Sequence, residues 1–145
     1  MSAALKHEAG RSETGGLKSI REQLEAVQAG YPLNDAATLM EKVTKGDSTL
    51  KKRILSQATL TRVRRPRDEA PVLKRDSSEK VARIERIWAR VLAIYQNDEA
   101  QAGAFMNRPH MMLAGKTPLE MTLEGETGAA FLNSVLGTIE HGFAA

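Results

Sequence analysis

The chain has 145 residues, of which 41% are hydrophobic and none is cysteine, and its formal net charge is +3 at pH 7. This length and composition suit one globular domain or two small ones with a modest core. Without cysteine the chain can form no disulfide, thiolate metal site or cysteine nucleophile, which agrees with a reducing cytoplasm, where we expect the protein to lie. No segment reaches the roughly 20 apolar residues of a membrane span, and residues 1–16 are expected to be a disordered tail.

The charge is unevenly divided along the chain. Residues 51–75 hold nine Lys or Arg and two acidic residues, a net +7, whereas residues 98–145 hold two basic and six acidic residues, a net −4. A basic stripe concentrates polyanions and an acidic surface repels them, so we expect the two regions to have different partners. The alternative for the basic stripe is a solvated face without a ligand.

The N-terminal half has apolar residues at helical spacing, with no repeat and no strand alternation. A first helix is predicted over residues 17–29, ended by Gly30. Three shorter helices are expected to follow, the first of them ended at Gly46 and the last, over about residues 57–65, ended by Pro66. Their predicted N-caps are, in chain order, Asn34 or Asp35, Asp47 or Ser48, and Ser56.

Residues 66–76 hold two prolines and are interpreted as a linker that brings Val72 and Leu73 onto the core. A long helix is predicted next, capped by Ser77 or Ser78 and running to about Gln96. The only tryptophan, Trp88, lies on the apolar stripe of this helix and is therefore expected in the core.

Three further helices are predicted towards the C-terminus. Asp98 is expected to cap the first, which ends before Asn107-Arg108-Pro109, and Thr117-Pro118-Leu119-Glu120 is a capping box that opens the second. Gly125 separates the second from the last helix, which His141-Gly142 is expected to close. The predicted inner face of that helix consists of Phe131, Val135, Leu136 and Ile139. Gly128 has no capping role, which indicates close backbone approach to a neighbour.

Residues 77–145 resemble the toxin-binding domain of the MbcA/ParS/Xre-type antitoxins. The resemblance rests on the long helix with its tryptophan and on the stretches FMNRPHMMLAGKTPLEM and GETGAAFLNSVLGTIEHG. The family's recurring residues fall here on Leu113, Gly115, Pro118, Gly128, His141 and Gly142. The turn Leu55–Leu60 and the Ser78-Glu79 pair are similar to the second half of the family's helix-turn-helix and to its following helix cap.

The predicted elements add up to an all-α fold of about eight helices, and the resemblance covers about residues 35–145 of it. We expect a degenerate helix-turn-helix-like region and linker over residues 17–76, joined by the long helix to a compact toxin-binding domain over residues 77–145. The resemblance implies an antitoxin without enzymatic activity or cofactor, whose partner is a toxin of the RES or ADP-ribosyltransferase-like type. Such an antitoxin covers the NAD site of its toxin, and a homodimer and operator DNA are further partners to consider. The three histidines are too scattered in the sequence for a metal site.

The proposed toxin-binding surface combines the segment between two C-terminal helices with the end of the chain. Its residues are Asn107, Arg108, Pro109, His110, Met111, Met112, Gly115, Lys116, Thr117, His141, Gly142, Phe143 and Ala145. Local alternatives stay open for several of them. His141 can interact with the helix dipole, the methionines can fill gaps in the core, and the two cations can pair with neighbouring carboxylates.

A DNA-binding repressor without a toxin partner is the alternative function. Its recognition helix would be about residues 57–65, and the candidate DNA contacts are Gln57, Thr59, Arg62, Arg64 and Arg65. The helix before it is short and the turn lacks the usual glycine. A degenerate helix-turn-helix kept for packing or dimerisation is therefore the competing interpretation.

Overall fold

The computed structural model describes residues 19–64 and 72–144, and that part of the chain contains eight α-helices, one 3-10 turn and no strand. The all-α prediction is confirmed. The helices are α2 (Ile20–Ala29), α3 (Leu33–Thr44), α4 (Ser48–Ile54), α5 (Gln57–Arg64), α6 (Arg75–Ile94), α7 (Glu99–Met106), α8 (Pro118–Leu123) and α9 (Glu126–Ala144), and the 3-10 turn is η1 (Met111–Leu113).

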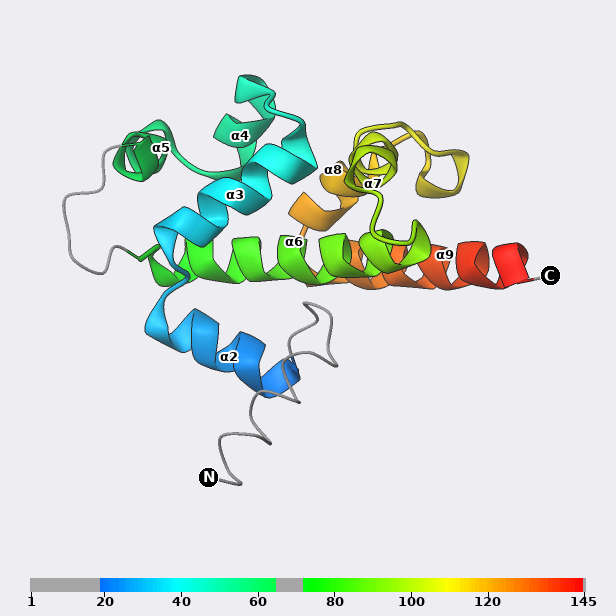
Figure 1. The fold of residues 1–145 in the computed structure, drawn as a ribbon, viewed down its shortest axis with the longest axis horizontal. Coiled ribbons are helices and arrows are strands. Elements are labelled where there is room, and N and C mark those ends of the chain that lie inside the picture. The colour runs from blue at the N-terminus through cyan, green and yellow to red at the C-terminus, as the bar shows by residue number, and fades with distance from the viewer. Residues whose placement is uncertain (1–18, 65–71, 145) are drawn as a thin grey trace.

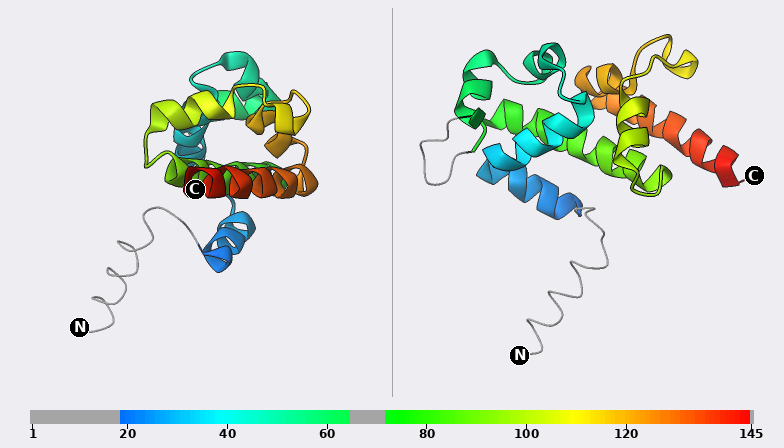
Figure 2. Two further views of the ribbon diagram at one scale, coloured as in Figure 1. Left: turned by 90° about the vertical axis from the view of Figure 1, so that its right-hand side faces the viewer. Right: turned by 45° about the horizontal axis from the view of Figure 1, so that its top comes forward.

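The long helix α6 organises the fold. It runs beside α9 along the long axis of the molecule, with α3, α4, α5, α7 and α8 on one side of this pair and α2 on the other (Figure 1 and Figure 2). Helix α6 contacts α2, α3, α4, α7, α8 and α9. Because α6 packs against helices from both halves of the chain, a single hydrophobic cluster includes residues from Tyr31 to Leu136.

The apolar stripe of α6 supplies the centre of this cluster. Trp88 is 4% exposed, which confirms its predicted place in the core. Tyr31 is also buried, and its hydroxyl donates a hydrogen bond to Glu85 on α6. Burial, reinforced by this carboxylate, raises the pKa of the Tyr31 phenol well above its usual range.

Most predicted helix starts are confirmed by their cap geometry. Asp47 accepts from the Thr49 N–H at 2.8 Å, and Asp98 caps α7. The start of α3 was predicted wrongly, because its N-cap is Pro32 without a side-chain hydrogen bond, so Asn34 and Asp35 lie inside the helix. The α2 helix begins after Ser19 in a capping box with Glu22.

The start of α6 also differs from the prediction. The helix begins at Arg75, before Ser77 and Ser78, and its N-cap is Lys74. Ser78 is buried, where its hydroxyl accepts from the Tyr31 N–H at 2.9 Å and donates to the Leu73 carbonyl at 3.2 Å. Its role is therefore to join the segments before α3 and α6, which local sequence cannot indicate. Leu73 reaches the core as predicted, whereas Val72 is exposed.

Two predictions for α9 are wrong. The helix continues through Gly142 to Ala144, so His141-Gly142 does not close it. Phe131 is 50% exposed and Leu132 is buried in its place. Gly128 sets this phase: its missing Cβ would lie 2.2 Å from the Met121 carbonyl oxygen, so this face of α9 lies against α8. Leu132, four residues on, follows Gly128 on that face, while Phe131 falls at its edge.

None of the helices in residues 19–64 and 72–144 combines the length and hydrophobicity that a membrane span needs.

Candidate functional site

The segment Asn107–Thr117, here called the α7–α8 loop, is held in shape by its own backbone. The His110 carbonyl accepts hydrogen bonds from the N–H groups of Leu113 and Gly115, both at 3.0 Å. Ala114 and Gly115 have left-handed φ angles of 56° and 83°, which reverse the chain towards α8. The loop therefore presents its side chains from a defined backbone.

The larger exposed side chains of the loop are Arg108, Pro109, Met111, Met112 and Lys116. Met111 is 91% exposed and Met112 45%. Adjacent exposed apolar side chains are typical of an interaction surface. Lys116 forms an ion pair with Glu124, whereas no ion pair to Arg108 is present in the described part of the chain.

Three loop residues from the predicted site serve the fold. The Asn107 amide donates to the carbonyl oxygens of Val43 at 2.7 Å and Gly103 at 2.9 Å, which joins α7 to α3. Thr117 forms the predicted capping box with Glu120. The His110 ring accepts from the Met112 N–H at 3.3 Å and packs edge-on against Phe105. These side chains are therefore occupied before any partner binds.

The end of α9 is separate from the α7–α8 loop. His141 and Gly142 are exposed in the last turns of the helix, whereas the Phe143 side chain and Ala145 lie outside the described atoms. No hydrogen bond or ion pair between the loop and these last turns is present among the described residues. The structure thus brings the loop residues together and leaves His141 and Gly142 apart from them.

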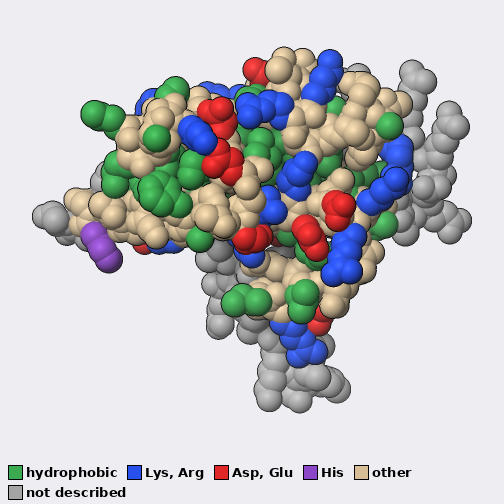
Figure 3. Space-filling view, turned by 180° about the vertical axis from the view of Figure 1, so that it is seen from behind, with side chains coloured by type: hydrophobic (Ala, Val, Ile, Leu, Met, Phe, Trp, Pro, Cys, Tyr) green, Lys and Arg blue, Asp and Glu red, His purple; other side chains and the backbone are tan. Residues whose placement is uncertain are grey.

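Acidic side chains of the C-terminal third form ion pairs, most of them with basic side chains from the rest of the chain. Glu126 pairs with Arg83 at 3.1 Å and Arg86 at 3.0 Å, and Glu140 pairs with Arg90 at 2.9 Å. Three further pairs involve Lys42 with Glu99, Arg53 with Glu120 and Lys116 with Glu124. Figure 3 shows Lys and Arg side chains beside Asp and Glu side chains over much of the rear face. The expected repulsive acidic surface is therefore not formed.

Two of these glutamates have a lowered pKa. The backbone hydrogen bond from Thr117 is the largest cause of the lowered pKa of Glu120, followed by the Thr117 hydroxyl. Burial acts to raise the pKa of Glu126, but the hydrogen bonds and charges of Arg83 and Arg86 outweigh it and lower the pKa. Both carboxylates therefore act as structural anions, Glu120 in the first turn of α8 and Glu126 in the first turn of α9.

A groove that the sequence analysis did not predict lies between η1, α8 and the start of α9. This α8–α9 groove has a volume of about 420 Å³. It is lined by Met112, Leu113, Ala114, Lys116, Met121, Glu124, Thr127, Gly128 and Phe131. The one hint in the sequence was Gly128, because a glycine kept in the first turns of a helix indicates a close neighbour.

Helix α5 carries four of the five candidate DNA contacts, Gln57, Thr59, Arg62 and Arg64. Gln57 is exposed at the first position of α5, and Thr59 is hydrogen-bonded with the capping Ser56 at 2.9 Å. Arg62 donates to the Val72 carbonyl at 3.4 Å. The Arg64 side chain and all of Arg65 lie outside the described atoms. The DNA-contact prediction thus stays a prediction.

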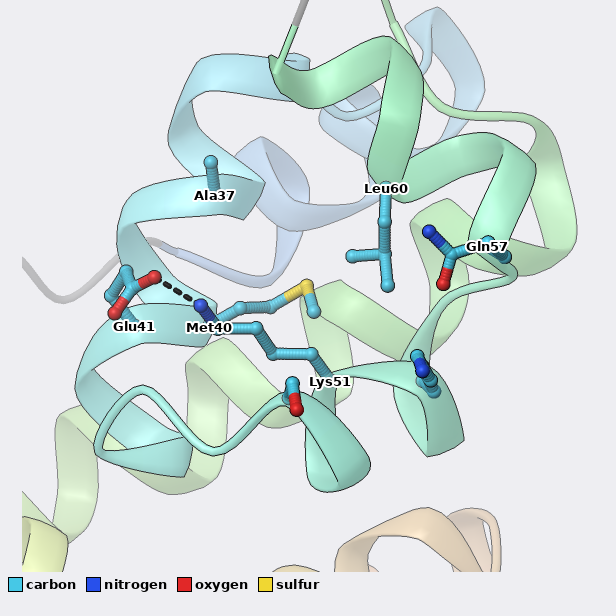
Figure 4. Close-up of a pocket in the computed structure, with 8 residues that line it drawn as sticks. Ala37, Met40, Glu41, Lys51, Gln57 and Leu60 are labelled. Carbon is cyan, nitrogen blue, oxygen red and sulfur yellow. Dashed lines mark hydrogen bonds and ion pairs between the residues drawn. The ribbon is translucent and has the colours of Figure 1, made fainter.

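A second pocket, of about 450 Å³, lies between α3, α4 and α5. Figure 4 shows Leu60 of α5 pointing towards Met40 of α3, while Lys51 reaches from α4 to form an ion pair with Glu41. Gln57 lies at the edge of this pocket. Among the described residues, no group of three or more His, Cys, Asp or Glu side chains lies together as a metal site would require.

Comparison with known proteins gives a match to the C-terminal part of the chain. Residues 90–142 match the family described as the antitoxin Xre/MbcA/ParS C-terminal toxin-binding domain. The chain is also 34% identical over 67 residues to a protein named Antitoxin Xre from Photorhabdus laumondii subsp. laumondii. That alignment covers 46% of this chain and 45% of the relative, so this chain is similar to about half of that protein. The matched range includes the α7–α8 loop and every residue that lines the α8–α9 groove.

Proposed function

We propose that this chain, which carries the toxin-binding domain of Xre/MbcA/ParS-type antitoxins over residues 90–142, is the antitoxin of a type II toxin–antitoxin system. Its partner is a toxin of the RES or ADP-ribosyltransferase-like type, and binding covers the toxin's NAD site. The observation that carries the proposal is the position of the match, which spans the C-terminal end of α6, the α7–α8 loop, α8 and most of α9. The toxin-binding unit extends over residues 77–145, with α6 as its base.

The exposed part of the α7–α8 loop is the proposed contact surface. Arg108 carries a guanidinium that can form two parallel hydrogen bonds with a carboxylate, and arginine is frequent among the residues that dominate interface energy. Lys116 is the weaker candidate because Glu124 already neutralises it. Met111 and Met112 add flexible apolar area that can adapt to the toxin surface. Asn107 and Thr117 take part indirectly, by holding the loop in place.

The proposed mechanism is steric. A rigid loop that enters or caps a substrate cleft loses little conformational entropy on binding, and the backbone hydrogen bonds that the His110 carbonyl accepts from Leu113 and Gly115 provide that rigidity. The end of the chain from His141 to Ala145 is the second proposed contact. The described part of this segment lies in the last turns of α9, and α9 ends at one end of the molecule (Figure 1). Neither contact requires a catalytic group or cofactor in this chain.

The proposal predicts a toxin gene beside the gene of this chain, and co-expression with that toxin tests it. Wild-type protein is expected to restore growth, Arg108→Glu to restore it poorly, and Lys116→Ala to restore it almost fully. Deletion of residues 143–145 is expected to weaken neutralisation without unfolding α9, because among the residues with described side chains the partly buried Ile139 is the last that packs against the core. If Arg108→Glu and the deletion both restore growth as well as wild type, the occluding surface lies elsewhere.

Autoregulation through DNA is a second candidate function, and the α4–α5 pair supports it. Gln57 and Lys52 are exposed on this pair, and no ion pair to Lys52 is present within the described range. Charge reversal at Arg62, Arg64 and Arg65 is expected to abolish salt-dependent binding to the chain's own promoter and to leave neutralisation intact. Unchanged mobility of that promoter DNA with wild-type protein at low salt would exclude the repressor function. Loss of toxin neutralisation in the folded triple variant would contradict the assignment of DNA binding to the N-terminal half and toxin binding to the C-terminal half.

A further inference from the structure

Exposed apolar side chains gather at one corner of the toxin-binding unit. The exposed large hydrophobic residues of the described chain are Ile20, Leu24, Val72, Met111, Met112 and Phe131. The last three lie on the α7–α8 loop and on the second turn of α9, and two of them, Met112 and Phe131, line the α8–α9 groove. The α7–α8 loop therefore carries Arg108, the exposed Met111 and part of the lining of an apolar groove.

The construction of the groove indicates what can occupy it. Leu113, Met121 and Gly128 are buried and form its floor, while the half-exposed Met112 and Phe131 form its walls. Gly128 makes the floor possible, since without a Cβ it allows α9 to approach the Met121 carbonyl. The floor thus consists of residues from the 3-10 turn η1 and the packed helices α8 and α9.

The charged groups at the groove are already paired. Lys116 and Glu124 both line the groove and form an ion pair with each other. A charged ligand would have to break this ion pair. An apolar side chain would leave the pair intact, and the burial of apolar surface in the groove would make its binding favourable. The groove therefore favours an apolar group that protrudes from a protein surface.

We propose that the α8–α9 groove is the anchor site of the toxin complex and that it receives a leucine-, methionine- or phenylalanine-like side chain protruding from the toxin. This inference rests on the proposed function and names the part of the surface that supplies most of its affinity. The toxin is the occupant because all nine lining residues lie within the matched toxin-binding range, and because the groove adjoins the loop that carries Arg108. Interface energy concentrates in such pockets, with an apolar anchor at the centre and polar contacts at the rim.

The test measures affinity for the purified product of the neighbouring toxin gene, made catalytically inactive. Met112→Asp and Phe131→Asp place a carboxylate in the groove wall at exposed positions, so both variants are expected to fold, which circular dichroism checks. Each is expected to bind about tenfold or more weakly than wild type. The matched control is Leu24→Asp, because Leu24 is 55% exposed on α2 and lies outside the matched range, and its affinity is expected to stay within about twofold.

The outcomes separate this inference from the proposed function. If both groove variants bind within twofold of wild type while Arg108→Glu binds weakly, the groove is not the anchor and the antitoxin function stands. If the groove variants change the chain's molar mass in light scattering and keep their toxin affinity, the groove is an interface between copies of this chain, which also overturns the inference. If wild-type protein does not bind the neighbouring gene product, the proposed function fails and the anchor site with it.

Discussion

Gly128→Ala is expected to destabilise the protein although alanine is the better helix former. Replacing a glycine inside a helix normally gains about 0.5–1 kcal/mol. Here the new Cβ would lie 2.2 Å from the carbonyl oxygen of Met121, and that obstacle is backbone, so α8 and α9 would have to separate. Overpacking costs about 1–3 kcal/mol, and a backbone clash places this case near the upper end. The expected net loss is therefore about 2 kcal/mol.

Gly137→Ala is the matched control on the same helix. The nearest atom to its new Cβ would be Nη2 of Arg90 at 3.6 Å, an ordinary contact, so the helix gain should be retained. For a chain of this size, thermal unfolding should show Gly128→Ala melting about 4–8 °C below wild type and Gly137→Ala about 1–4 °C above it. A Gly128→Ala variant that melts at or above wild type would refute the close approach of α8 and α9, and with it the floor of the groove.

Three further predictions concern the framework around the site. Trp88→Ala removes a buried aromatic side chain of α6 and is expected to cost about 3–5 kcal/mol; a melting temperature within a degree or two of wild type would show that Trp88 is not in the core. Asn107→Ala removes two amide hydrogen bonds and leaves two carbonyl oxygens without them, so chemical denaturation should reveal a loss of about 1–3 kcal/mol, and an unchanged midpoint would contradict this. The pKa of Glu126 in the folded protein is lower than its ordinary value of 4.5. The ionised carboxylate should therefore stabilise the fold at pH 7, and this stabilisation should be lost as the pH falls from 4.5 through the lower folded-state pKa. The pairs with Arg83 and Arg86 are partly exposed, so Glu126→Gln should cost at most about 1 kcal/mol at pH 7, and a difference that persisted at pH 2 would refute the assignment.

The sequence could predict those parts of the site that depend on neighbours a few residues away. The Thr117 capping box, the Asp98 cap and the end of α7 before Asn107 all lie where the sequence placed them. The exposed loop between α7 and α8 followed from these ends. The structural role of Asn107 in this loop could not be predicted in the same way, because its side-chain amide donates a hydrogen bond to the carbonyl of Val43, 64 residues earlier in the chain.

Contacts between segments that are distant in the sequence determine which charges are paired and which apolar side chains line the groove. The acidic character of residues 98–145 is a property of the sequence, but arginines from α6 neutralise Glu126 and Glu140 once the helices pack. Phe131 and Leu132 are both apolar, and periodicity alone could not choose between them. The close contact between Gly128 and α8 fixes which face of α9 is buried, so Leu132 is buried and Phe131 is exposed.

The sequence by itself determined the all-α class, most helix boundaries and the family resemblance, because caps, glycine turns and apolar spacing act over three to seven residues of the chain. The tertiary structure decided which polar groups are occupied and which apolar groups remain exposed. Ser78 illustrates the first case, since its hydroxyl bonds the backbone of Tyr31 rather than capping α6. Phe131 illustrates the second, since its exposure depends on how closely α8 and α9 approach each other, and the free energy of that approach comes from packing between segments rather than from either segment alone.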